Sequence, residues 1–114
     1  MFINNQVVEV DQAIQDQVRL FNELGYKTHS SCSGHPWRPA DFPYIAFNDY
    51  NFRVDLAAPL CGLEFKDNRH NFTFWKMAVY GKKEGDTEGF LRSINDLLKI
   101  LLVIKMVEDK LETE

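Results

Sequence analysis

The residues from Gly25 to His35 combine several side chains that can do chemistry. They read Gly-Tyr-Lys-Thr-His-Ser-Ser-Cys-Ser-Gly-His, so serine, cysteine and histidine side chains are concentrated in one short segment. Backbone N–H groups in a turn of this composition can bind an anion, and the hydroxyls add further donors. Cys32 lies three residues from a histidine on each side, so a metal or a reactive thiol must also be weighed.

A site for a nucleotide-like or other anionic ligand is the function that this segment favours. The serine hydroxyls and the backbone at Gly34 would hold the anion, and His35 and Arg38 would neutralise it. The rings of Trp37 and Tyr44 would stack on the organic part of the ligand. A bulky residue in place of Gly34 is then expected to abolish ligand binding without unfolding the protein. The expected ligand-binding residues are Ser30, Ser31, Ser33, Gly34, His35, Trp37, Arg38 and Tyr44.

Other roles for this segment stay open. His29, Cys32 and His35 offer atoms that zinc prefers, but steps of three residues at the end of a strand place them on alternating sides. No Cys-x-x-Cys pair supports them, so no metal is expected. A catalytic thiolate would need a lowered pKa and access to solvent. The commoner role of a cysteine is to fill buried space, which is the role expected of Cys32 and Cys61. The serines could also simply cap turns.

The composition is that of an ordinary globular protein. At 114 residues, with 45% apolar and 26% charged side chains, the chain predicts a single domain over residues 1–114. The net charge of −4 argues against nucleic acid as a partner, because binding to phosphates needs a basic surface. The longest apolar run, residues 100–104, is far shorter than the ~20 residues of a membrane span. Residues 1–6 do not resemble a signal peptide, so we expect a cytoplasmic location with reduced thiols.

Apolar residues at the helical period predict an amphipathic helix from Val10 to Leu24, with Asp11 as the N-cap and Gly25 as the stop. Strands are expected at Tyr26–Ser31 and at Pro43–Asn48.

Residues 49–62 fit two structures. Asp49 could cap a short helix through Ala58, but an extended segment fits nearly as well. Leu63–Lys66 and Asn71–Tyr80 are expected to be strands joined by a turn at residues 67–68. Apolar residues fall on both faces of the second strand, which predicts a central position in the sheet.

Residues 87–112 predict a long helix with apolar residues on more than one face. Because a small domain rarely leaves such a helix exposed, we expect self-association through it. The order of elements predicts an α+β fold: a mostly antiparallel or mixed sheet with an N-terminal helix and a long C-terminal helix.

Part of this chain resembles the tRNA wybutosine-synthesising protein 3 family. The matching pattern is Thr-x-Ser-Ser-Cys-Ser-Gly at Thr28–Gly34, which follows the expected helix as it does in that family. The family usually has an arginine next, where this chain has His35, and the similarity ends at Gly34. The resemblance implies an S-adenosylmethionine-dependent methyltransferase acting on tRNA, although the chain carries no glycine-rich dinucleotide-binding motif and no motif that identifies a cofactor.

The layout also resembles short uncharacterised proteins of bacteria and phages. They share Gly-Tyr-x-Thr-x-x-Ser-Cys-x-Gly-His followed by Tyr-Ile-x-Phe, here Gly25–His35 and Tyr44–Phe47. Some small phage proteins sequester nucleotide signals of host defence, and a compact oligomer with a nucleotide-sized site would suit that role. An enzyme that uses a thiol or a metal, and a plain interaction protein that uses its long helix, are the alternatives.

Overall fold

The computed structural model describes residues 2–3, 6–7, 10–35 and 41–113. Short strands β1 (Phe2–Ile3) and β2 (Gln6–Val7) pair with each other at the N-terminus. The remaining elements are the 3₁₀ turn η1 (Gln12–Ile14), α1 (Gln15–Glu23), β3 (Thr28–Cys32), β4 (Tyr44–Phe47), α2 (Phe52–Ala57), the 3₁₀ turn η2 (Pro59–Cys61), β5 (Glu64–Asp67), β6 (Met77–Tyr80) and α3 (Thr87–Glu112).

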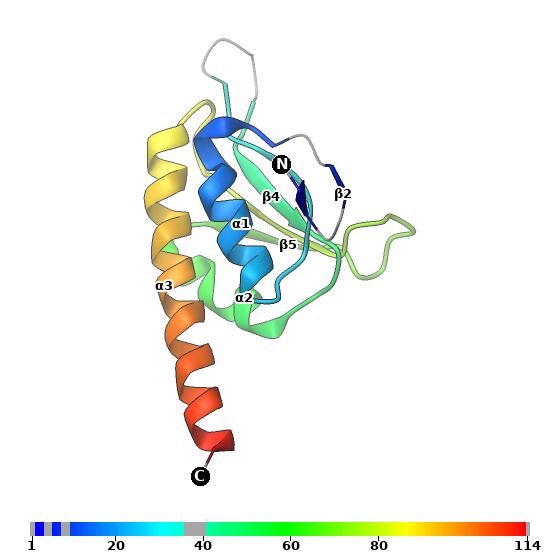
Figure 1. The fold of residues 1–114 in the computed structure, drawn as a ribbon. Coiled ribbons are helices and arrows are strands. Elements are labelled where there is room, and N and C mark those ends of the chain that lie inside the picture. The colour runs from blue at the N-terminus through cyan, green and yellow to red at the C-terminus, as the bar shows by residue number, and fades with distance from the viewer. Residues whose placement is uncertain (1, 4–5, 8–9, 36–40, 114) are drawn as a thin grey trace.

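An antiparallel sheet in the order β3-β4-β6-β5 forms the centre of the molecule. Alternate strand residues, among them Ile45, Phe47 and Val79, are buried against the helices. In Figure 1, α1 and α3 lie side by side against the sheet, and α2 lies near the middle of α3. The α+β fold with an N-terminal helix and a long C-terminal helix is therefore confirmed.

The N-terminal helix forms as predicted, but its start differs. A 3₁₀ turn precedes α1, and the chain leaves the helix through Gly25, whose φ is +96°. Asp11 stands at the N-cap position of this turn, as predicted, but its side chain makes no capping hydrogen bond. Its carboxylate accepts hydrogen bonds from the N–H and the hydroxyl of Ser33 instead. The Asp11 side chain therefore makes a long-range contact with the β3 loop and not a local cap of the helix.

The ambiguous middle segment is helical. Asn51, and not Asp49, caps α2, because its side-chain oxygen accepts the N–H of Arg53 at 2.9 Å. Pro59 follows the helix directly and starts the tighter turn η2. Val54 and Ala57 are buried in the core, which is why the helical form prevails over the extended one.

Strand β6 is central, as predicted, but much shorter than expected. It begins at Met77, and residues 68–76 form a loop in place of the first half of the predicted strand. The buried side chain of Asn68 holds this loop, because its amide donates to Thr73 Oγ1 and to the carbonyl of Trp75. Phe72 is fully exposed there and does not alternate into the core.

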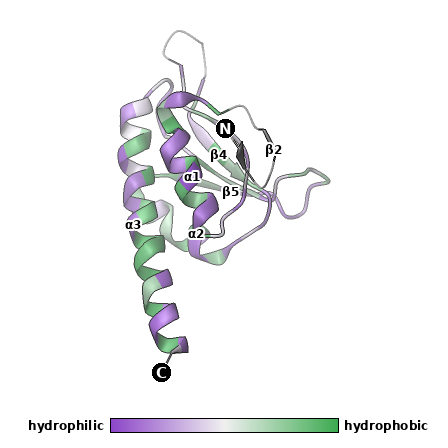
Figure 2. Ribbon diagram, in the orientation of Figure 1, coloured by the Kyte–Doolittle hydropathy of each residue, from purple (hydrophilic) through white to green (hydrophobic). Residues whose placement is uncertain are grey.

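Helix α3 begins at Thr87 as predicted, with Asp86 as its N-cap. Its first half is buried along one face, through Phe90, Ile94, Leu97, Leu98 and Leu101. Its second half extends past the rest of the domain, and apolar residues continue along it (Figures 1 and 2). Among the described residues, the helices are all too short or too polar to cross a membrane.

Replacing Asp86 by alanine should lower the free energy of unfolding by about 1 kcal/mol, the usual cost of losing an N-cap. The carboxylate accepts the N–H of Gly89 at 3.0 Å, and that donor would lose its partner. Glu88→Ala removes the same charge from the same helix end without touching the cap, so it should cost only a few tenths of that amount. Urea denaturation measures both variants, and equal losses would mean that the helix dipole, and not the cap, is responsible.

Candidate functional site

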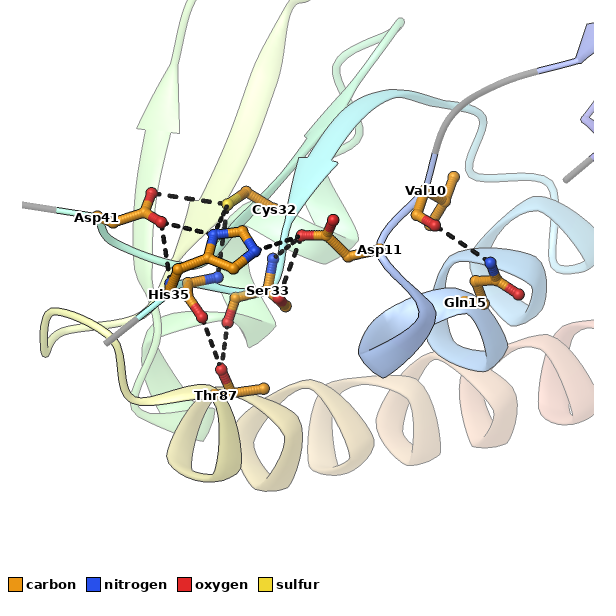
Figure 3. A network of polar contacts seen from close by, with 9 residues as sticks. Val10, Asp11, Gln15, Cys32, Ser33, His35, Asp41 and Thr87 are labelled. Carbon is orange, nitrogen blue, oxygen red and sulfur yellow. Dashed lines mark hydrogen bonds and ion pairs between the residues drawn. The ribbon is translucent and has the colours of Figure 1, made fainter. Parts of the chain in front are cut away.

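The loop after β3 is tied to the start of α3. The hydroxyl of Thr87 lies 2.7 Å from the carbonyl oxygen of Ser33 and 2.9 Å from that of Gly34, and it is shared between them (Figure 3). The carbonyls of a turn would otherwise have to find other donors once buried. This contact brings residues 33–35 to the N-terminal end of the long helix.

Gly34 is required at this turn for two reasons. Its φ is +77°, a left-handed conformation that other residues adopt at a cost. A Cβ atom on it would also lie 2.9 Å from Cδ of Pro43, which precedes β4. A bulky residue at Gly34 is therefore expected to destabilise the fold, and the expectation that it would act on ligand binding alone stays untested.

Four polar side chains converge beside this turn: Asp11, Cys32, His35 and Asp41, here called the acidic cluster. The imidazole of His35 lies between the two carboxylates, with Nδ1 2.7 Å from Asp41 Oδ2 and Nε2 3.6 Å from Asp11 Oδ2. The backbone N–H of His35 donates to the same Asp41 oxygen at 2.9 Å. Its side chain is only 17% exposed, so the ring is held in a defined position (Figure 3).

The thiol of Cys32 completes the cluster. Its Sγ lies 3.8 Å from His35 Nδ1 and 3.7 Å from Asp41 Oδ1, and it accepts the N–H of Gly34. Partial burial raises the pKa of this thiol, and the nearby carboxylates of Asp41 and Asp11 raise it further. The hydrogen bond with His35 lowers the pKa of Asp41, so that carboxylate stays ionised. Without a bound cation, Cys32 is therefore a neutral thiol at neutral pH, which does not support a catalytic thiolate.

The structure brings together only some of the residues expected from the sequence. Ser33 is buried, and both of its donors are bound by Asp11, so a carboxylate of the chain itself fills the expected anion position. Ser30 and Ser31 lie on β3, where the Ser30 hydroxyl contacts His29 Nδ1 at 3.3 Å.

Among the described residues, His29 and Tyr44 do not belong to this cluster. His29 is exposed and its ring stacks on Phe74, away from Cys32 and His35. Tyr44 is the partner of Cys32 in the β3–β4 pairing. Trp37 and Arg38 lie outside the described residues.

Sequence reasoning missed Asp11 and Asp41. Asp41 follows His35 by six residues across two prolines, a spacing that carries no helix or strand period. Asp11 is 22 residues away from Ser33 and its position before a helix suggested a cap. A general expectation that a buried histidine finds a carboxylate partner is the signal that could have pointed to Asp41.

An open hollow of about 700 Å³ lies next to the acidic cluster, and Asp41 belongs to both. We call it the tyrosine hollow, because Tyr44 and Tyr80 form its aromatic part, with ring centroids 5.7 Å apart. The two residues face each other across β4 and β6 in the same register row as Cys32 and Glu64. Burial and the neighbouring Tyr44 raise the pKa of Tyr80, so its phenol stays a hydrogen-bond donor. The hollow is lined by Asp41, Phe42, Tyr44, Glu64, Phe65, Lys66, Tyr80 and Gly81.

Comparison of the chain with models of protein families, with curated proteins and with solved structures found no match. Both resemblances noted in the sequence therefore stay predictions.

Gly34 needs both a positive φ and room against Pro43, whereas Gly25 needs only the positive φ. The stabilities of alanine variants at the two positions therefore separate the two requirements. Gly25→Ala should cost about 1 kcal/mol of unfolding free energy, because its φ is positive but nothing lies within 4 Å of the added Cβ. Gly34→Ala should cost about 2 kcal/mol more, since the new methyl group must also displace Pro43. Chemical denaturation compares the two variants, and similar losses would show that Pro43 yields easily.

Proposed function

We propose that the protein binds a small nucleotide-like molecule with its planar ring system in the tyrosine hollow. The observation that carries the proposal is the pair Tyr44 and Tyr80, held side by side on adjacent strands at the wall of an open hollow. A planar heterocycle stacks on aromatic side chains with a gain of about 1–3 kcal/mol per base. The position next to the loop 33–35 agrees with the region that the sequence singles out.

The polar groups of the hollow favour a ligand that donates hydrogen bonds. Asp41 is ionised and accepts hydrogen bonds, and Glu64, the β5 partner of Tyr80, lines the hollow as well. These carboxylates suit ribose hydroxyls or an exocyclic amino group. Among the described residues that line the hollow, Lys66 is the only one with a positive charge. Its Nζ also lies over the Trp75 ring.

The net charge of this lining is negative, because two carboxylates face one lysine. A ligand with few phosphates is therefore favoured over a triphosphate. A cytoplasmic location, where nucleotides are abundant and the free thiols of Cys32 and Cys61 stay reduced, is part of the proposal.

Titration calorimetry with nucleosides, their mono- and triphosphates, cyclic dinucleotides and S-adenosylmethionine tests this proposal. We expect binding of at least one nucleoside or monophosphate, and a loss of roughly 5- to 100-fold in Tyr80→Leu, which keeps the apolar volume but removes the ring. Phe72→Leu is the control, because Phe72 is exposed and outside the hollow. Binding of S-adenosylmethionine in particular would support the methyltransferase resemblance. No binding at millimolar concentrations, or unchanged binding in Tyr80→Leu, would overturn the proposal.

We also infer that a second copy of the chain packs on the second half of α3. Apolar side chains that are more than half exposed recur there at helical spacing: Val103, Met106, Val107 and Leu111. This part of the helix extends past the rest of the domain (Figure 1). Lysines and acidic residues both flank the stripe, including the pair Lys105–Asp109, so the surface can be complementary to itself, as a two-fold interface requires.

The molar mass in solution tests the self-association. The double variant Val103→Glu/Val107→Glu should reduce the mass from that of an oligomer to that of one chain, because the new carboxylates of each chain would face those of the other across the interface. Arg92→Glu changes the net charge by the same amount at an exposed position in the first half of α3, outside the proposed interface, so it should leave the mass unchanged. Light scattering after size exclusion gives the result. A monomeric wild-type protein, or an intact oligomer in the double variant, would refute this interface.

A further inference from the structure

We infer that Asp11, Cys32 and His35 bind a zinc ion, and this inference does not rest on the proposed ligand of the tyrosine hollow. One ligand atom from each residue lies within 4.8 Å of the other two. This set differs from the three candidates that sequence spacing suggested, because Asp11 takes the place of His29. The site is built in space from three segments of the chain, and for this reason the linear motif did not reveal it.

The donor atoms identify the kind of metal. A thiolate, an imidazole nitrogen and a carboxylate oxygen are the ligands that zinc prefers, whereas Mg²⁺ and Ca²⁺ take oxygen ligands almost throughout. A ligand set that combines sulfur, nitrogen and oxygen is intermediate between soft and hard, and it therefore matches zinc, which is a borderline-soft ion. Three protein ligands leave one position open for water or a substrate, as catalytic zinc sites do.

The distances are close to those of a tetrahedral site. Zinc bonds of about 2.0–2.3 Å place neighbouring ligand atoms about 3.3–3.8 Å apart. His35 Nε2 lies 3.6 Å from Asp11 Oδ2, and Cys32 Sγ lies 3.8 Å from Nδ1, the other nitrogen of the same ring. The three ligand atoms all lie within 4.8 Å of one another, at most about an ångström farther apart than in a tetrahedral site. Side-chain adjustments of about an ångström would therefore be enough, and the backbone could stay in place.

The surrounding residues hold these ligands in position. Asp41 lies 2.7 Å from His35 Nδ1, so it can fix the tautomer that directs Nε2 toward Asp11. Ser33 fixes Asp11 through its N–H and hydroxyl, and Thr87 fixes the Ser33 and Gly34 carbonyls. Figure 3 shows the His35 ring between Asp41 and Asp11, with Cys32 and Ser33 beside it. A carboxylate that orients a histidine ligand is a regular feature of zinc sites.

The charges also favour a cation. Two carboxylates and a thiol surround a single imidazole, and none of the three side chains is fully exposed. Partly buried groups of like charge repel each other unless a positive charge lies between them. A zinc ion supplies that charge at the centre of the cluster.

Metal titration of protein stripped with a chelator is the test. Zn²⁺ in competition with a chromophoric chelator should bind at one ion per chain. Co²⁺ should give the intense visible bands of a tetrahedral site and a thiolate-to-cobalt charge-transfer band in the near ultraviolet. The cobalt spectrum of the wild-type protein needs no variant, so it tests the site even where a substitution impairs folding. Absence of stoichiometric zinc binding, or a cobalt spectrum without the thiolate band, would overturn the inference.

Matched variants then assign the ligands. Cys32→Ser should abolish the charge-transfer band, and His35→Gln and Asp11→Asn should each weaken zinc binding by more than tenfold. Cys61→Ser and His29→Gln are the controls. They should change neither the charge-transfer band nor the zinc affinity, because neither residue belongs to the cluster. Asp41→Asn, at a positioning residue, should weaken binding by about 10- to 100-fold and keep the thiolate band. A band that persists in Cys32→Ser, or one that is lost in Cys61→Ser, would contradict the assignment.

Discussion

The hydrogen bond from Thr87 to the carbonyls of Ser33 and Gly34 is the contact on which the candidate site depends. It joins the first turn of α3 to the end of β3, two elements separated by more than fifty residues. The turn can approach the helix only because Gly34 has a left-handed backbone and no side chain against Pro43. With the turn fixed in this way, His35 is directed between Asp11 and Asp41, and the chemistry of the site follows from that placement.

Charge decides which chemistry the acidic cluster can perform. An anion would have to compete with Asp11 for the donors of Ser33, and a thiolate at Cys32 would have to form beside two carboxylates. Both cost free energy, because like charges in a partly buried site repel each other. A cation is attracted by the carboxylates that would repel an anion, and it would stabilise the thiolate of Cys32 as well. The same residues that are poorly suited to an anion are therefore well suited to a metal, and the planar ligand is left to the neighbouring hollow.

The sequence predicted the elements that a local period encodes. Helix α3, strand β4 and the central place of β6 follow from apolar spacing alone, and the structure confirms them. The first half of the predicted strand at Asn71–Tyr80 failed, because the buried side chain of Asn68 satisfies the loop backbone in a way that no alternation pattern records. The contact of the Asp11 side chain with Ser33 was missed for the same kind of reason. A capping residue and a residue that holds a distant turn look alike in sequence, and only the packing of η1 against the β3 loop distinguishes them.

Asp41 couples the acidic cluster to the tyrosine hollow. One of its oxygens contacts His35, and the same residue lines the hollow that contains Tyr44 and Tyr80. The register row from Cys32 through Tyr44 to Tyr80 fixes the two rings relative to the thiol, because backbone hydrogen bonds hold each strand against the next. A change of charge in the cluster would therefore alter the electrostatic potential in the hollow without any movement of the sheet. Binding at the two places would then be linked through Asp41, and by the reciprocity of linked equilibria each ligand would change the affinity for the other by the same factor.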